Sequence, residues 1–177
     1  MDQTTLLIAL RTEINDLEEP YRYEDWALLD FVQSAVSDYS RYRPRHRRGS
    51  ITLLPNMSEY KLPEDYQTWI KGLEDYEILD DILYLDFPPL GPLVVPFTYL
   101  GDHDIASLPN AATSLILDYC MWKMLSDVVR EGSEISELKL GKGLDIKFDN
   151  FDQITELAET RRCSYLASVQ KPVGGGT

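Results

Sequence analysis

The chain has 177 residues, with 30 acidic side chains against 17 basic ones and a formal net charge of −13. This length is enough for one domain to bury a core without disulfides or metals. An apolar fraction of 44% is too high for a disordered chain. So large a negative charge excludes a protein that coats DNA or RNA, because phosphate binding requires a cationic surface. Any contact with nucleic acid has to be local.

The first residues lack the basic start of a signal peptide, and charged residues interrupt every long apolar stretch. We therefore expect a protein that is neither secreted nor embedded in a membrane. Two cysteines, Cys120 and Cys163, lie within helical patterns and have no partners at the spacing of a zinc site. Both are predicted to be reduced structural thiols, and neither a metal nor a cofactor is expected.

Apolar residues recur at helical spacing in four segments, and the expected helices cover about residues 3–18, 24–40, 109–131 and 149–168. The third is apolar around most of its circumference. A helix of that kind is buried on more than one side. We therefore expect it at the centre of the core or against another subunit.

Between the second and third helices, residues 50–100 alternate short apolar and aromatic runs with prolines and turn residues. Residues 50–54 and 59–62 flank a turn sequence and predict a hairpin. Three further runs are strand candidates: 69–73, 82–85 and 94–99.

These segments predict an α+β fold. Residues 1–170 are expected to form a mainly helical single domain of four helices, one of them long and central, with a small antiparallel β-sheet or hairpin insertion. No internal repeat and no linker divides the chain. Residues 171–177 contain Pro172 and three glycines, and they predict a flexible tail.

Few residues offer catalytic chemistry. The run Asp102-His103-Asp104 is the one arrangement able to orient an imidazole, and the alternative is a solvated acidic loop. Neighbouring acids such as Asp80 and Asp81 serve hydrolysis only where two of them face one cleft. Thirty acidic residues make such pairs inevitable. We therefore expect a protein that is not an enzyme, with an acidic hydrolase that uses carboxylates and His103 as the enzymatic alternative.

The most unusual stretch runs from Arg41 to Arg48 and holds five arginines in eight residues. Without these five, 12 basic residues remain against 30 acidic ones, a net charge of −18 for the rest of the chain. Guanidinium groups hold carboxylates or phosphates through paired hydrogen bonds, and an interleaved tyrosine adds a stacking surface. We expect a loop that docks a protein, with a nucleic-acid patch and a merely solvated loop as alternatives. The candidate partner-binding residues are Arg41, Tyr42, Arg43, Arg45, Arg47 and Arg48.

Several short motifs follow one another along residues 20–168. They are Tyr23-Glu24-Asp25-Trp26-Ala27-Leu28-Leu29, Tyr42-Arg43-Pro44, Ile51-Thr52-Leu53-Leu54-Pro55, Tyr60-Lys61-Leu62-Pro63-Glu64-Asp65, Phe97-Thr98-Tyr99-Leu100-Gly101-Asp102-His103, Leu108-Pro109 before the long apolar helix, and Ala158 with Arg161, Arg162 and Tyr165. This ordered set resembles the head-tail adaptor, or connector, proteins that complete the neck of tailed bacteriophages.

The resemblance implies a structural virion protein of the head-tail interface, present in the host cytoplasm during assembly. Such a protein forms a dodecameric ring below the portal protein and joins it to the tail or to a tail-terminator or nozzle protein. The genomic DNA passes through its channel during packaging and ejection without specific binding, and an acidic channel wall repels DNA.

The resemblance brings no catalytic residues. From its segregated positive charge, we expect the arginine segment, Arg41 to Arg48, to dock on the portal or on a neighbouring subunit. The last helix is expected to dock through Arg161, Arg162 and Tyr165. A small acidic DNA- or protein-binding regulator that uses residues 41–48 is the alternative.

Overall fold

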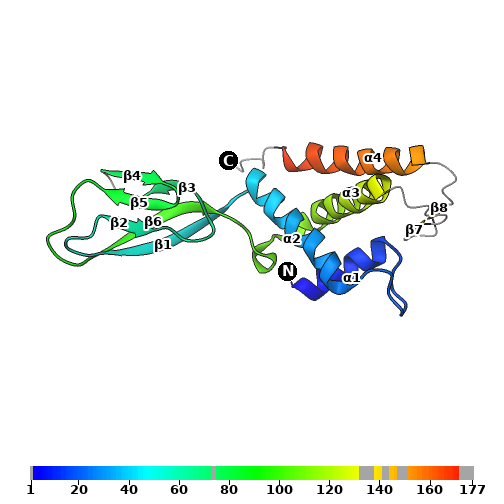
Figure 1. The fold of residues 1–177 in the computed structure, drawn as a ribbon, viewed down its shortest axis with the longest axis horizontal. Coiled ribbons are helices and arrows are strands. Elements are labelled where there is room, and N and C mark those ends of the chain that lie inside the picture. Colours follow the sequence, from blue (N-terminus) through cyan, green and yellow to red (C-terminus); the bar gives the residue numbers. More distant parts are fainter. Residues whose placement is uncertain (1, 73–74, 132–137, 141–143, 147–150, 172–177) are drawn as a thin grey trace. The chain divides into compact units, whose positions relative to one another are not determined.

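The computed structural model describes residues 2–72, 75–131, 138–140, 144–146 and 151–171. The chain divides into two compact units. The helical unit consists of residues 1–42 and 104–177, and the β unit consists of residues 43–103 (Figure 1). The mixed fold expected from the sequence is confirmed, and the single domain expected for residues 1–170 consists of two compact units.

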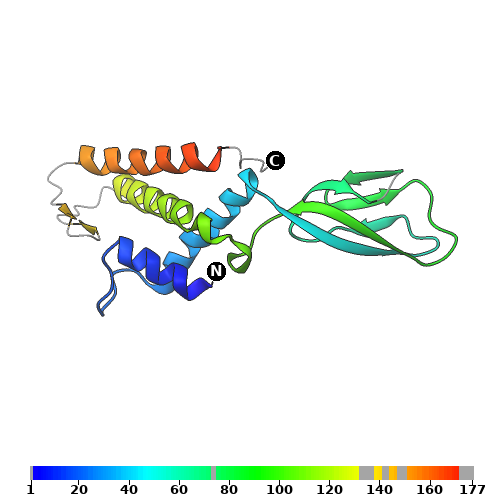
Figure 2. The same cartoon turned by 180° about the vertical axis from the view of Figure 1, so that it is seen from behind.

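Four α-helices dominate the described part of the helical unit. Its elements are α1 (Gln3–Glu13), α2 (Asp25–Tyr42), the short 3-10 turns η1 (Ile105–Ser107) and η2 (Asn110–Ala112), α3 (Thr113–Glu131), the paired strands β7 (Leu138–Leu140) and β8 (Leu144–Ile146), and α4 (Phe151–Val169). Helix α3 packs against α1, α2 and α4, as both views of the fold show (Figures 1 and 2). The prediction that this helix is central is confirmed.

The core of the helical unit surrounds α3. Ile116, Cys120 and Met121 have almost no exposed surface and belong to one buried cluster with side chains from α1, α2 and α4. Members from those helices include Leu6 and Leu10 of α1, Leu28, Val32 and Ala35 of α2, and Ile154, Ala158, Tyr165 and Val169 of α4. The apolar circumference of α3 is therefore accounted for largely within the chain.

Helix α1 ends at Glu13, five residues before the predicted end at residue 18. Asn15 takes a left-handed conformation with φ 53°, which stops the helix. The carboxylate of Asp16 then accepts hydrogen bonds from the backbone N–H groups of Arg22 and Tyr23 at 2.8 and 3.2 Å. The apolar pattern continued past residue 13, but these bonds fold the chain back.

The other helices start and end close to their predicted limits. Helix α3 begins at Thr113 rather than at residue 109, because the Ala112 N–H donates to the Pro109 carbonyl at 2.9 Å and forms a tighter turn first. Residues 149 and 150, expected in the last helix, lie outside the described residues, as does the expected tail from residue 172 onward.

The described residues of the β unit form two three-stranded antiparallel sheets, ordered β1-β6-β3 and β2-β5-β4. The strands are β1 (Arg45–Leu53), β2 (Glu59–Lys61), β3 (Tyr66–Lys71), β4 (Tyr76–Leu79), β5 (Ile82–Leu85) and β6 (Leu93–Gly101). A second core lies between the sheets, because side chains from both contribute to one buried cluster. Its most buried members are Leu53, Tyr60, Leu62, Leu83 and Leu85.

The predicted hairpin of residues 50–54 and 59–62 is wrong. Strand β1 pairs with β6 and strand β2 pairs with β5, so the chain crosses from one sheet to the other between them. The Tyr60 hydroxyl stabilises the connection between β1 and β2. It accepts a hydrogen bond from the Leu54 N–H at 2.8 Å and donates one to the Met57 carbonyl at 2.9 Å. A short turn sequence marks a change of direction but does not specify which strands pair.

Asp80 and Asp81 form the two-residue turn between β4 and β5. Both have positive φ values, 49° and 61°, as the tight hairpin turn requires, and aspartate tolerates that conformation. This adjacent pair of acids is therefore a turn. The hairpin of β4 and β5 went unpredicted in part because its turn lacks glycine.

Candidate protein interface

The arginine segment was expected to be a loop, and this prediction is wrong. Arg41 and Tyr42 form the last residues of α2, and β1 begins at Arg45. The strand starts five residues earlier than the predicted β region because Arg45–Arg48 pair with residues 98–101 of β6. The segment therefore crosses from the helical unit into the β unit, and Arg41, Tyr42, Arg45 and Arg48 are exposed.

The side chain of Arg47 is mostly buried within the β unit. Its Nη1 lies 2.8 Å from Asp65 Oδ2, and the side chains of both residues are about three-quarters buried. The Tyr99 hydroxyl donates to Asp65 Oδ1 at 3.1 Å, and burial together with this hydrogen bond raises the pKa of Tyr99. Because Asp65 already neutralises Arg47, this arginine is a structural member of the sheet.

The Asp102-His103-Asp104 run is divided among separate structural roles. The Asp102 backbone N–H donates to the Asp65 carbonyl at 2.8 Å, and His103 Nε2 lies 3.1 Å from the Arg43 carbonyl. Asp104 caps the η1 turn by accepting the Ser107 N–H at 2.7 Å. Among the described residues, no three His, Cys, Asp or Glu side chains gather where they could hold a metal ion.

Tyr165 lies inside the helical unit rather than on a docking surface. Its side chain is fully buried, and its hydroxyl donates to Asp38 Oδ2 on α2 at 2.7 Å. Its ring meets that of Tyr119 edge-on, with the centroids 5.2 Å apart. Burial, followed by the interaction with Asp38, raises the pKa of Tyr165. The structure therefore places Tyr165, an expected docking residue, in the core of the helical unit and not on its surface.

The two arginines of α4 differ in their surroundings. Arg161 lies between Asp118 of α3, at 2.6 Å, and Glu13 of α1, at 3.3 Å. It therefore joins three helices. Arg162 pairs with Glu159 one turn earlier at 2.8 Å, and its side chain is 40% exposed. Of the three residues expected to dock the last helix, Arg162 is the one placed on the surface.

The cysteines also differ. Cys120 is fully buried in the helical core, and burial raises the pKa of its thiol to about 12. Cys163 is exposed on α4. The structural role predicted for Cys120 is confirmed, since a buried neutral thiol behaves as a small apolar side chain.

One end of the β unit carries an exposed apolar surface that the sequence did not reveal. Register places Leu53 opposite Leu93, and the Leu85 N–H donates to the Ser58 carbonyl at 2.9 Å, so the loops after β1 and after β5 share this end (Figure 1). We call this surface the apolar tip. It consists of Leu54, Met57, Phe87, Leu90, Leu93 and Val94.

The two most exposed residues of the apolar tip are Phe87, at 83%, and Leu90, which is fully exposed. Both belong to the proline-rich connection between β5 and β6. The signal in the sequence was the presence of large apolar residues among prolines, where neither helical nor strand periodicity assigns them to a core. Large apolar residues without periodicity are candidates for an interface.

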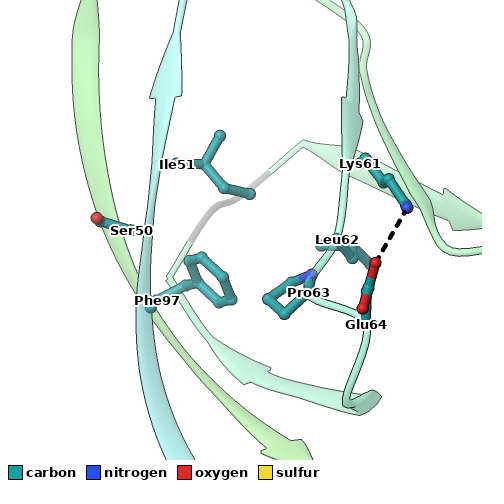
Figure 3. Close-up of a pocket in the computed structure, with 8 residues that line it drawn as sticks. Ser50, Ile51, Lys61, Leu62, Pro63, Glu64 and Phe97 are labelled. Atoms are coloured by element: carbon teal, nitrogen blue, oxygen red, sulfur yellow. Dashed lines mark ion pairs between the residues drawn. The ribbon is translucent and has the colours of Figure 1, made fainter.

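A groove borders β1 on the same unit. It has a volume of about 350 Å³, and its walls include Gly49, Ile51, Leu62, Pro63 and Phe97 (Figure 3). Lys61 and Glu64 lie at the groove with Nζ and Oε1 3.8 Å apart. A side chain at residue 49 would meet the Phe97 ring, since a Cβ there would lie 2.6 Å from Phe97 Cζ. Glycine therefore lets the Phe97 ring lie directly beneath β1.

None of the helices in the described part of the chain is long and apolar enough to cross a bilayer. Comparison with models of known protein families and with curated protein sequences finds no match to this chain. Its function therefore has to be inferred from its own residues and surfaces.

Proposed function

We propose that this protein is a structural head-tail adaptor of a tailed bacteriophage. In this proposal its copies form a ring below the portal, join the head to the tail, and leave a channel for the genome. The proposal rests on the ordered motifs described above and on the surfaces of the β unit. The observation that carries it furthest is the apolar tip.

The apolar tip has the composition of a protein interface. A soluble chain rarely concentrates large exposed apolar side chains at one end unless that end binds something. Exposed polar residues flank these side chains along the chain, among them Asn56 and Ser58 beside Met57 and Asp86 beside Phe87. An apolar centre with a polar rim is typical of surfaces that bind other proteins. The tip thus favours an assembly protein over an isolated regulator.

The arginines also support an assembly role. Arg45 and Arg48 are exposed on a regular strand, where the backbone holds them in fixed positions. A surface that binds flexible single-stranded nucleic acid combines cations with stacking aromatic rings. In this segment the exposed aromatic residue, Tyr42, belongs to the helical unit, whereas Arg45 and Arg48 belong to the β unit. The fixed cations fit a protein partner with carboxylates better.

Negative-stain imaging of the purified protein, alone and with a candidate portal protein, tests the proposal. We expect rings, or rings seated on the portal. The variant Phe87→Ser with Leu90→Ser is expected to lose portal or tail binding while keeping its fold. Trp26→Ser is the matched control, because Trp26 is an exposed apolar residue of the helical unit at 68%.

Free DNA provides the opposing test. The regulator alternative predicts a gel shift that weakens steeply with salt, because bound phosphates release counterions. The adaptor proposal predicts little affinity for free DNA at any salt concentration. A salt-dependent gel shift without rings or portal binding would contradict the adaptor.

A further inference from the structure

The β unit has a basic edge and an acidic edge. Strand β1 is the outer strand of its sheet, with β6 on one side, and among the described residues no strand pairs with the other side. Arg45 and Arg48 are exposed along it. Strand β4 is an outer strand of the second sheet. It contains the exposed Glu77, and the exposed turn acids Asp80 and Asp81 follow it directly.

These two edges lie on opposite sides of the unit. Strand β1 leads directly into β2 through residues 54–58, so both strands lie at one side. Strand β3, at the other edge of the first sheet, contacts β4, since the ring centroids of Trp69 and Tyr76 are 5.1 Å apart. A basic edge on one side and an acidic edge on the other are complementary between copies of the same chain.

The groove beside β1 supplies an apolar site at the basic edge. A strand that adds to a free edge gains backbone hydrogen bonds, and every second side chain turns toward the same face of the sheet. A groove bordered by Gly49, Ile51 and Phe97 can receive one such side chain (Figure 3). Leu79, on β4, is 57% exposed and is an apolar side chain of the kind that the groove would receive.

We propose that the β1 edge of one copy binds the β4 edge of the next, with Leu79 in the groove and the acids of β4 against Arg45 and Arg48. This inference deepens the proposed ring by naming its subunit contact, and it rests on that proposed function.

Charge complementarity holds for either direction of the incoming strand. With Leu79 beside Gly49, a parallel strand brings Glu77 toward the arginine half of β1. An antiparallel strand brings Asp80 and Asp81 there instead. Both arrangements place carboxylates beside guanidinium groups, which they bind through charge-assisted hydrogen bonds.

The contact joins two different surfaces, so every bound copy still offers one free edge of each kind. Repetition of such a contact closes into a ring when the rotation between copies closes, and it otherwise extends into a filament. Edge strands in isolated proteins are commonly protected by charged side chains that prevent association. That explanation predicts that loss of Arg45 and Arg48 increases self-association, whereas the proposed contact predicts a decrease.

Two charge variants of the full chain test the contact. The β1 variant carries Arg45→Glu and Arg48→Glu. The β4 variant carries Glu77→Lys with Asp80→Asn and Asp81→Asn, because asparagine keeps the left-handed turn accessible. Sedimentation velocity of each variant alone is expected to show self-association at least about ten-fold weaker than that of the wild-type chain. Circular dichroism and the thermal midpoint verify that each variant is folded.

An equimolar mixture of the two variants is the decisive measurement. The acidic β1 of one variant then meets the basic β4 of the other, and the unaltered edges also remain complementary. Assembly is expected to return, with the two chains alternating. The control variant, Arg22→Glu with Arg130→Glu, changes the net charge by the same amount as the β1 variant and is expected to assemble as the wild type does, because both arginines are exposed on the helical unit.

Several results would overturn the contact. They are a wild-type chain that stays monomeric at all concentrations, variants that assemble as well as the wild type or better, and a mixture that restores nothing. Rings that form on a portal from either variant alone would overturn this contact and leave the adaptor function standing. Charge-dependent assembly in a chain that binds no portal would contradict the adaptor and leave the contact standing.

Discussion

The helical unit and the β unit both contain internal arginines, but the β unit places exposed arginines beside an internal one on a single strand. In the helical unit, Arg11 is buried and lies 2.6 Å from both Asp16 and Asp25, and Arg161 bridges α1, α3 and α4. In the β unit, Arg47 is paired inside the sheet while Arg45 and Arg48 face solvent. A count of charges along the chain cannot distinguish these cases. Burial separates arginines that hold the fold together from those that are able to bind a partner.

Apolar residues show the same contrast. The helical unit encloses α3 almost completely, and its core contains side chains from all four helices. Among the described residues of the β unit, the buried cluster between the sheets has five members, yet the unit exposes the six residues of the apolar tip. The helical unit thus gains stability within the chain, whereas the β unit offers surface for assembly. The following changes test that division.

The largest effect is expected from Arg11→Met. This change leaves the buried Asp16 without its cation and removes the bond from Arg11 Nη2 to the Tyr23 carbonyl at 2.9 Å. Breaking a buried pair from one side costs about 3–5 kcal/mol. Urea denaturation should show this loss in the free energy of unfolding. The exposed pair of Arg162 and Glu159 is the control, and Arg162→Met should leave the transition nearly unchanged.

Tyr165→Phe is expected to cost about 1–2 kcal/mol, because it removes a buried hydrogen bond to a charged group and keeps the ring. Urea denaturation again measures the change, with Tyr42→Phe, an exposed tyrosine, as the control. If Tyr165 were instead a docking residue, the substitution would leave the stability of the subunit intact and weaken assembly alone.

Alkaline pH should destabilise the helical unit through Cys120. Its thiol has a pKa of about 12 in the folded chain, whereas an unfolded cysteine ionises near pH 8.5. Between these values the unfolded state binds fewer protons, so stability falls as pH rises, by up to about 1.4 kcal/mol per pH unit. Tyr165 adds a fall of the same sign above about pH 10, because its folded pKa is also raised.

Unfolding free energies measured from pH 8 to about pH 11 test this slope. Cys120→Ala should make it shallower, and Cys163→Ala should not, because Cys163 is exposed. Identical slopes in the wild type and Cys120→Ala would contradict the assignment. At mildly alkaline pH, a thiol reagent should label Cys163 in the folded chain and Cys120 after unfolding.

The smallest effect on stability is expected at the apolar tip. Phe87→Ser with Leu90→Ser should change the unfolding free energy by no more than about 0.5 kcal/mol, since both side chains are exposed. The same change should reduce binding of a hydrophobic dye such as anilinonaphthalene sulfonate. A large loss of stability would show that the tip belongs to the core of the β unit, which would remove the main support for an assembly surface.

Much of the helical unit was predictable because helices follow from local spacing. The apolar pattern placed α2, α3 and α4 within a few residues of their observed limits, and it identified α3 as central. The end of α1 was not predictable, since Asp16 bonds to residues six and seven positions later, and these bonds arise only when the loop closes.

The β unit was predictable in its strand content and not in its pairing. Residues near Ile51, Leu83 and Phe97 were recognised as strands, yet β1 pairs with β6 across more than forty residues, and the neighbouring strand β2 belongs to the other sheet. Strand pairing depends on which strand faces become buried together. The sequence pattern of one strand does not indicate which distant strand it pairs with.

The sequence by itself determined an acidic α+β protein, the position of its central helix, and a basic segment of five arginines in an acidic chain. Composition and periodicity can be read directly from the sequence, so these features do not depend on knowing the fold. Only the tertiary structure decided that Arg47 pairs inside the sheet, that Tyr165 is buried against Asp38, and that loops far apart in the chain share the apolar tip. Those outcomes depend on contacts between residues far apart in the sequence, which form only when the helices and the sheets pack around their cores.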